Sequence, residues 1–172
     1  RVMASVWSWV TYMKDGFIQQ IGTPRESFDH PADLFVASLI GTPQMNFFDA
    51  KLLKEGGKYN VTVGDVKVAL PESKQKVLVE KNVNAQDITL GVRPSHITLG
   101  EGANTLSAMV DVSEMMGIEV HLHDNARGRD VVVIVPTMDL SSVNFAAGTT
   151  LHLHFDGNVC HHFDSEGKNF EF

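Results

Sequence analysis

Short strand-like runs separated by turn residues dominate the chain from about residue 45 onward. Residues 59 to 63 alternate between apolar and polar side chains, Gly64-Asp65 supplies a turn, and the alternation resumes over residues 66 to 70. This pattern predicts a half-buried β-hairpin. The remaining runs recur at a spacing that favours a small closed barrel or a sandwich: MNFFDAKLL, ITLGV, SAMVDVSEM, IEVHLH, DVVVIV, TTLHLHF and NVCHHF. We therefore expect a mainly β fold, α+β overall.

One segment of this β-rich half favours a helix. Residues 72 to 80 carry helix-forming side chains, although Val77-Leu78-Val79 within them is equally compatible with a strand. The pattern also leaves open whether the β-rich half is one barrel with a long excursion or two subdomains.

The first 43 residues have a different texture. Asp15-Gly16 lies between two segments rich in aromatic and β-branched residues and predicts a hairpin over residues 9 to 22. Thr23-Pro24-Arg25-Glu26 has the spacing of a capping box and predicts the start of a helix. Pro31 interrupts that helix, and a second helical segment should end before Gly41 and Pro43.

Composition excludes several functions. The 172 residues are 43% hydrophobic and 20% charged, which is typical of a folded globular chain. A net charge of −7 argues against nucleic-acid binding, because no broad cationic surface can neutralise phosphates. The longest aliphatic run, Val131–Val135, is far shorter than the about 20 residues of a membrane-spanning helix. A single cysteine, Cys160, fits a reducing compartment.

Several histidines raise the question of a metal site. His121 and His123 are two residues apart, as are His152 and His154, and each pair would project from one face of a strand. The compact four-ligand spacing of a structural zinc site is not recognisable in the sequence. We therefore interpret the pairs as exposed faces of amphipathic strands and expect no metal ligands. The residues expected to point inward are Leu122, Leu151, Leu153 and Phe155.

Four stretches carry a family resemblance. MKDGFIQQIGTPRESFDHPADLFVASLIGTPQMNFFDAKL, from Met13 to Leu52, resembles the end of the nucleotide-binding cassette in ATPase subunits of ABC importers for maltose, multiple sugars and glycerol-phosphate. GVRPSHI, from Gly91 to Ile97, resembles a signature segment of the C-terminal transport-associated barrel of those subunits. VSEMMGIEVHLH and LHLHFDGNVCHHFD resemble its later strands.

The resemblance implies a fold and a division of the chain. Residues 1–43 would be the C-terminal remnant of the nucleotide-binding domain, and residues 44–172 an OB-like or MOP-like β-barrel with a regulatory role. Three features depart from the family pattern: Ser95 stands where an acidic residue is common, Thr42 replaces the commoner Ser, and residues 1–12 do not resemble the cassette.

The resemblance also bears on catalysis. ATP hydrolysis in this family needs a P-loop of the form GxxxxGK[ST], whose backbone amides cradle the phosphates. No such string occurs in these 172 residues. We therefore read the chain as a fragment of a longer, ATP-hydrolysing subunit. The fragment itself is expected to be no enzyme and to have no catalytic or cofactor-binding residues. ATP and Mg²⁺ would bind in the part of the parent subunit outside it.

Three residues of the GVRPSHI segment are candidates for a regulatory or interface site: Arg93, Ser95 and His96. The planar guanidinium of Arg93 could bind an anion or a carboxylate of a partner. Alternatively, Gly91 and Pro94 only shape the exit from a strand while Arg93 pairs locally.

The function implied by the resemblance is that of a regulatory and dimerisation region. The intact subunit would form a homodimer on the cytoplasmic face of a bacterial inner membrane, drive ABC permease transmembrane subunits and contact a regulatory protein, with the fragment itself soluble. The alternative is a barrel that senses a small ligand, an oxyanion or a sugar phosphate. An autonomous enzyme is a third possibility, for which we expect no turnover.

Overall fold

A computed structural model describes residues 9–101, 104–138 and 145–172. The first eight residues of the atypical stretch 1–12 therefore lie outside the described part. Within the described residues no helix is long and apolar enough to cross a membrane.

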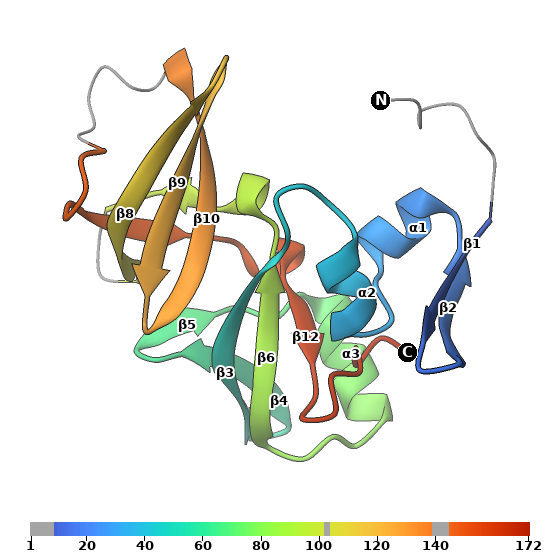
Figure 1. Ribbon diagram of the computed structural model, residues 1–172. Helices are drawn as coiled ribbons and strands as arrows, with labels where there is room; N and C mark the ends of the chain where they lie inside the picture. Colours follow the sequence, from blue (N-terminus) through green and yellow to red (C-terminus); the bar gives the residue numbers. More distant parts are fainter. Residues whose placement is uncertain (1–8, 102–103, 139–144) are drawn as a thin grey trace.

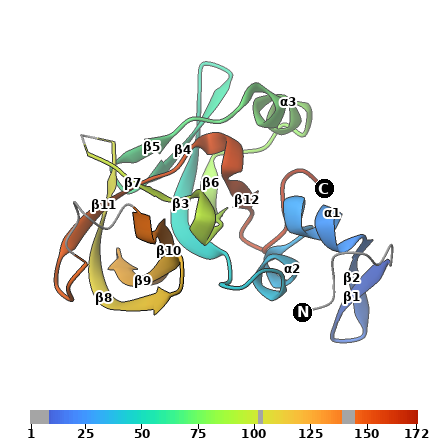
Figure 2. The same ribbon diagram turned by 90° about the horizontal axis from the view of Figure 1, so that it is seen from above.

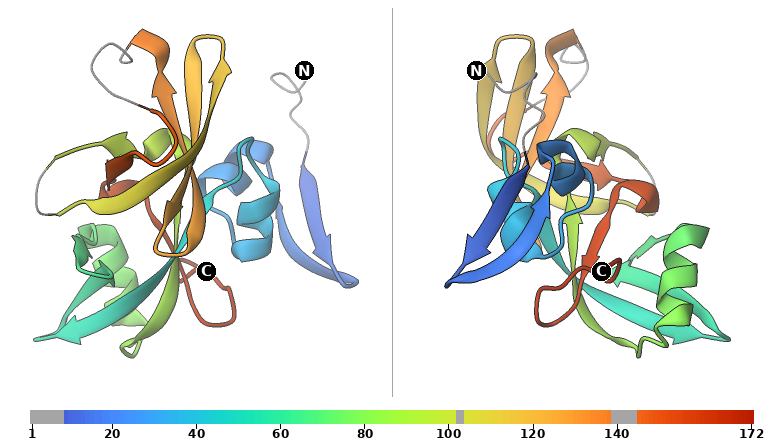
Figure 3. Two further views of the ribbon diagram at one scale, coloured as in Figure 1. Left: turned by 60° about the vertical axis from the view of Figure 1, so that its left-hand side comes forward. Right: turned by 90° about the vertical axis from the view of Figure 1, so that its right-hand side faces the viewer.

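The N-terminal segment, residues 9–43, consists of a hairpin and two short helices. β1 (Val10–Lys14) pairs antiparallel with β2 (Phe17–Gly22) through Asp15 and Gly16, whose φ angles of 52° and 84° suit a tight two-residue turn. The helices α1 (Pro24–Asp29) and α2 (Leu34–Leu39) follow. The predicted hairpin and helical pair are confirmed. Figures 1 and 3 show the hairpin projecting away from the rest of the molecule, with the helices at its base.

Local hydrogen bonds explain where the two helices begin. The amide of Glu26 donates to Oγ1 of Thr23 over 3.2 Å, and the amide of Thr23 donates to the Glu26 carboxylate over 2.8 Å. This is the predicted capping box. The second helix begins at a side chain that the sequence analysis did not single out, because Asp33 accepts from the amide of Val36 over 2.8 Å.

The β-rich half forms two antiparallel five-stranded sheets (Figures 1 and 2). The first has the order β12-β6-β3-β4-β5, and the second β10-β9-β8-β11-β7. Figure 2 shows the second sheet curling around its own interior. The strands of the first sheet are β3 (Asn46–Glu55), β4 (Lys58–Val63), β5 (Val66–Val68), β6 (Gln86–Val92) and β12 (His161–Phe163). Those of the second are β7 (Thr98–Leu99), β8 (Leu106–Met116), β9 (Glu119–Ala126), β10 (Arg129–Pro136) and β11 (Thr150–His154).

The two sheets share one hydrophobic core. Buried residues of both sheets belong to a single cluster, in which the rings of Phe48 and Phe155 stack with centroids 5.6 Å apart. Asn46 joins the sheets at the edge of this core: its side-chain amide donates to the carbonyl of Val132 and accepts from the Val132 amide, both over 2.8 Å. The β-rich half thus consists of two sheets that pack around one shared core.

Two local predictions are decided by the structure. Residues 72 to 80 form a helix, α3 (Glu72–Glu80), and the strand reading of residues 77 to 79 is wrong because these residues have helical hydrogen bonding, in which the amide of Lys81 donates to the carbonyl of Val77 over 3.0 Å. The run NVCHHF is only partly a strand, because a 3-10 turn (Gly157–Val159) precedes β12. Gly157 lies so close to the carbonyl of Ala69 that a β-carbon there would be 1.5 Å from its oxygen.

Candidate functional site

The GVRPSHI segment begins at Gly91, a position of β6 that is closely covered by the side chains of Met45 and Phe163. A β-carbon at Gly91 would lie 2.5 Å from the sulfur of Met45 and 3.1 Å from the ring of Phe163. Only glycine fits this position without moving Met45. Pro94 then opens a 3-10 turn (Pro94–His96) that ends the strand. Gly91 is thus required for close packing in β6, and Pro94 begins the turn by which the chain leaves this strand.

Arg93 points inward and holds the N-terminal segment against the β-rich half. It is 3% exposed, and its guanidinium donates to the carbonyl of Phe28 over 3.0 Å and to the carbonyl of Ile40. The same group lies 4.0 Å from the centre of the Phe28 ring, which adds a cation–π contact. Because Phe28 lies in the last turn of α1 and Ile40 caps α2, one side chain satisfies the ends of both helices.

The turn that approaches Arg93 is also constrained. Gly41 has a φ of +99°, and a β-carbon there would lie 3.0 Å from the guanidinium of Arg93. The Gly-Thr-Pro turn thus needs glycine for its backbone angle and for this approach. Burial lowers the pKa of Arg93 from its usual range, and the charge of Asp29 opposes that shift.

Ser95 and His96 lie apart from the Arg93 guanidinium. Both side chains are exposed on the 3-10 turn, whereas Arg93 is buried beneath it. The structure therefore does not bring the three candidates together into one site. The regulatory or interface role of these three residues stays a prediction. Only Ser95 and His96 are exposed at the surface, whereas Arg93 is buried.

A second junction, which the sequence analysis missed, lies in the C-terminal segment, residues 164–172. The side chain of Asn169 donates to the carbonyl of Pro31 over 2.8 Å, and its backbone amide donates to Ala32 over 2.9 Å. The amide of Leu34 donates to Gly167 over 2.8 Å. Asn169 is 2% exposed, so its bonds are shielded from water. The end of the chain is thereby tied to the connection between α1 and α2.

Helix α3 holds the same C-terminal segment from the other side. Lys74 donates to the carbonyl of Cys160 and lies 3.7 Å from a carboxylate oxygen of Glu171. Burial lowers the pKa of Lys74, and Glu171 opposes that shift. Lys81 donates to the carbonyl of Phe170 over 2.8 Å. The C-terminal segment thus joins the N-terminal helices to α3.

The histidine pairs lie on the strand faces expected for them. The four inward residues of β9, of β11 and of the position directly after β11 are at most 8% exposed: Leu122, Leu151, Leu153 and Phe155. The histidines of the two pairs are half-buried on β9 and exposed on β11. Across the ranges that the structure describes, no group of three or more His, Cys, Asp or Glu is arranged to hold a metal ion.

His161 and His162 behave differently from those pairs because His162 is buried and His161 is partly buried. His162 is 5% exposed, and among the described atoms Nε2 of His162 and Nδ1 of His161 have no hydrogen-bond partner. Burial, reinforced by the positive charge of Lys74, lowers the pKa of each to about 3. Both are therefore neutral at pH 7.

Two family models match the chain. Residues 41–97 match a MalK OB fold domain, and residues 90–163 match a TOBE domain. The boundary near residue 43 predicted for the N-terminal segment is not tested by these matches.

Relatives among characterised and uncharacterised proteins agree with these matches. The chain is 34% identical over 158 residues to the ABC transporter ATP-binding protein YcjV of Escherichia coli O6:H1, covering 91% of the chain and 42% of that protein. It is 32% identical over 163 residues to the oligosaccharides import ATP-binding protein MsmX of Bacillus subtilis, with the same two coverages. It is 32% identical over 157 residues to the sn-glycerol-3-phosphate import ATP-binding protein UgpC of Burkholderia cenocepacia, again with coverages of 91% and 42%.

A solved structure shares the fold. The molybdate-bound form of the cytoplasmic molybdate-binding protein ModG superposes with a TM-score of 0.53 at 13% identity, covering 68% of this chain and 94% of that one. The chain spans less than half the length of the curated relatives it matches. The chain thus carries MalK OB fold and TOBE domains, and its relatives, which match 91% of its length, are ATP-binding subunits of ABC importers.

Proposed function

We propose that the chain is the regulatory and dimerisation region of an ATP-binding subunit that serves an importer of sugars or related solutes. The observation that carries the proposal is the double junction between the N-terminal segment and the β-rich half. Arg93 holds the ends of α1 and α2, and Asn169 holds the connection between them. Relatives named for the import of oligosaccharides and of glycerol-3-phosphate support the transport role.

The junction gives this region a way to influence the cassette. Both tie points are buried and use backbone carbonyls of α1, α2 and their connection as acceptors. A displacement of the β-rich half would therefore carry the two helices with it, as packed elements move in coupled rigid-body shifts. Residues 1–43 would belong to the nucleotide-binding domain and residues 44–172 to the regulatory domain, with the two ties crossing between them.

An exposed apolar surface supports contact with other proteins. Four large apolar side chains at the end of the β8–β9 hairpin and directly after β10 are 55 to 89% exposed. We call this surface the apolar hairpin end; it consists of Met115, Met116, Ile118 and Met138. The amide of Thr137 donates to Ile118 over 2.8 Å, which keeps the two parts side by side. Clustered exposed apolar residues are typical of protein interaction sites, and methionine suits adaptable ones.

The intact subunit would act as a homodimer that binds ATP and Mg²⁺ in its cassettes and drives permease subunits. It would work at the cytoplasmic face of a bacterial inner membrane. The ties through Arg93 and Asn169 would pass signals from a regulatory protein to the cassettes, and the apolar hairpin end would take part in holding the pair together.

A ligand panel separates this function from that of a small-ligand sensor. We expect calorimetric titration of the chain with molybdate, sulfate, glycerol-3-phosphate and common sugars to give no binding heat, because regulation would come through protein contacts. Saturable binding of any of these compounds at micromolar concentrations would favour the sensor. Cooperative thermal unfolding of the same sample is the control, because it shows that the protein used in the titrations is folded.

A further inference from the structure

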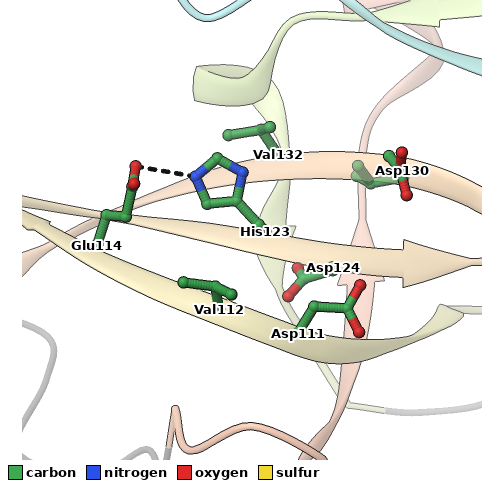
Figure 4. Close-up of a pocket in the computed structure, with 8 residues that line it drawn as sticks. Asp111, Val112, Glu114, His123, Asp124, Asp130 and Val132 are labelled. Carbon is green, nitrogen blue, oxygen red and sulfur yellow. Dashed lines mark hydrogen bonds and ion pairs between the residues drawn. The ribbon is translucent and has the colours of Figure 1, made fainter.

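An acidic pocket opens on the second sheet, away from the junction described above. It has a volume of about 390 Å³ and is lined from β8, β9 and β10 (Figure 4). Its carboxylates come from all three strands: Asp111, Glu114, Asp124 and Asp130. The lining is completed by His123, Val112, Val131 and Val132, and among these described residues there is no lysine or arginine.

A β-bulge directs Asp111 to the pocket. The pairing of β8 with β9 shifts between Val110 and Val112, so that Asp111 has no opposite residue on β9. Bulges re-aim side chains in this way and are common beside functional sites. In Figure 4 the carboxyl group of Asp111 lies next to that of Asp124 on the neighbouring strand.

Asp124 occupies a position that the strand pattern reserves for the core. Along β9 the residues Val120, Leu122, Asp124 and Ala126 form the buried face, and Asp124 is 1% exposed. Among the described atoms neither of its carboxylate oxygens has a hydrogen-bond partner. Buried carboxylates are otherwise paired or hydrogen-bonded, because an unpaired charge loses its hydration without compensation. A donor that enters the pocket would supply the missing partner.

The other charges of the pocket do not supply that donor. Nε2 of His123 lies 3.0 Å from a carboxylate oxygen of Glu114, so this histidine is engaged with Glu114. Asp111 and Asp130 add negative charge. The described part of the chain holds no set of three side chains arranged as metal ligands. The pocket is also far larger than a bare metal ion needs.

We propose that the acidic pocket binds an organic cation, a guanidinium or a primary ammonium group, anchored by the carboxylates of Asp124 and Asp111. Such a group carries several N–H donors and positive charge, and a guanidinium can bond both oxygens of one carboxylate. Val112 and Val132 would pack against the alkyl chain that bears the cation.

The titration of the pocket agrees with this assignment. Burial raises the pKa of Asp124 to about 6, Asp111 adds to the rise and His123 opposes it. The other titratable groups that line the pocket are Asp111 and Glu114 of β8, His123 of β9 and Asp130 of β10. A bound cation should lower the pKa of Asp124, and affinity should fall as the pH drops below 6.

The test uses calorimetry at pH 7.5 with two organic probes and one metal. Agmatine represents a free guanidinium compound, N-acetyl-arginine amide represents an arginine side chain of a protein, and MgCl₂ represents a hard metal ion. We expect at least one organic probe to bind at micromolar to millimolar concentration. Asp124→Asn and, separately, Asp111→Asn should each weaken its binding at least tenfold, whereas Glu55→Gln at an exposed site on β3 should leave it unchanged.

The two organic probes identify the source of the cation. Preference for agmatine indicates a free small molecule, and equal or better binding of the arginine amide indicates a side chain of a partner protein. Amide resonances of Val112 and Val132 in ¹H–¹⁵N spectra should shift with the bound probe. Binding of Mg²⁺ alone, absence of binding by both organic probes, or binding that both pocket variants leave intact would overturn the proposal.

Discussion

Replacing Arg93 by methionine should lower the free energy of unfolding by about 3 kcal/mol, because a buried, charged donor that serves two backbone carbonyls is lost. The carbonyls of Phe28 and Ile40 would lose their partner, and the cation–π contact with Phe28 would disappear. Arg93→Lys should recover part of the loss, since an ammonium group cannot reproduce the planar fork. Urea unfolding measures both variants.

Arg25→Met is the matched control for this prediction. Arg25 lies on α1, its side chain is 92% exposed and its ion pair with Asp29 spans one helical turn. Removing it should change the free energy of unfolding by no more than about 0.5 kcal/mol. In Arg93→Met, hydrogen exchange should quicken over residues 24–40 before it does in the two sheets. Equal stability of Arg93→Met and Arg25→Met would show that the junction does not depend on Arg93.

Acidification from pH 7 to pH 5 should destabilise the protein, with about 2 kcal/mol of the loss due to His162 alone. In the folded state burial lowers the pKa of His161 and His162 to about 3, against 6.5 for the free side chain. The unfolded chain therefore binds more protons between those values, and stability falls as the pH drops from 6.5 toward 3. Well above pH 6.5 both histidines are neutral in both states and have no such effect.

Asp124 acts in the opposite direction over part of this range. Its pKa is raised to about 6 in the folded state from 3.8, so the folded state binds more protons between these values. This carboxyl group makes the protein less stable as the pH rises through that interval. The net acid effect remains destabilising because two histidines with larger shifts oppose one aspartate.

His162→Leu isolates the histidine contribution. The variant should lose about 2 kcal/mol less than the parent between pH 7 and pH 5, measured by chemical unfolding at each pH. His152→Leu, at an exposed position on β11, should keep the pH dependence of the parent. If His162→Leu and the parent showed the same dependence on pH, proton uptake by the buried imidazole would not be the cause.

Features decided by neighbouring residues could be predicted from the sequence. The turn at Asp15-Gly16 and the capping box from Thr23 to Glu26 depend on contacts within a few residues, and both were found. The alternation of polar and apolar residues in β4, β9 and β11 likewise gave the inward faces. In these elements the preference of the local sequence and the structure of the whole fold coincide, so the residue pattern alone predicts them.

Long-range partners could not be predicted in the same way. Arg93 pairs with a carbonyl 65 positions away, and the side chain of Asn169 with one 138 positions away. Backbone carbonyls carry no signature in the sequence, so neither junction could be read from residue types. Asp124 did leave a signal, because it interrupts the apolar face of β9 between Leu122 and Ala126. The division of the β-rich half into two sheets required the strand order.

The molar mass of the chain in solution tests the proposed dimerisation role most directly. Light scattering coupled to gel filtration at tens of micromolar should give twice the 18.9 kDa of one chain. Ile118→Asp, at a position 81% exposed in the apolar hairpin end, should shift the population toward monomer without lowering the thermal stability of the chain. A mass of one chain for the unaltered protein across this concentration range would contradict a dimerisation role for this region.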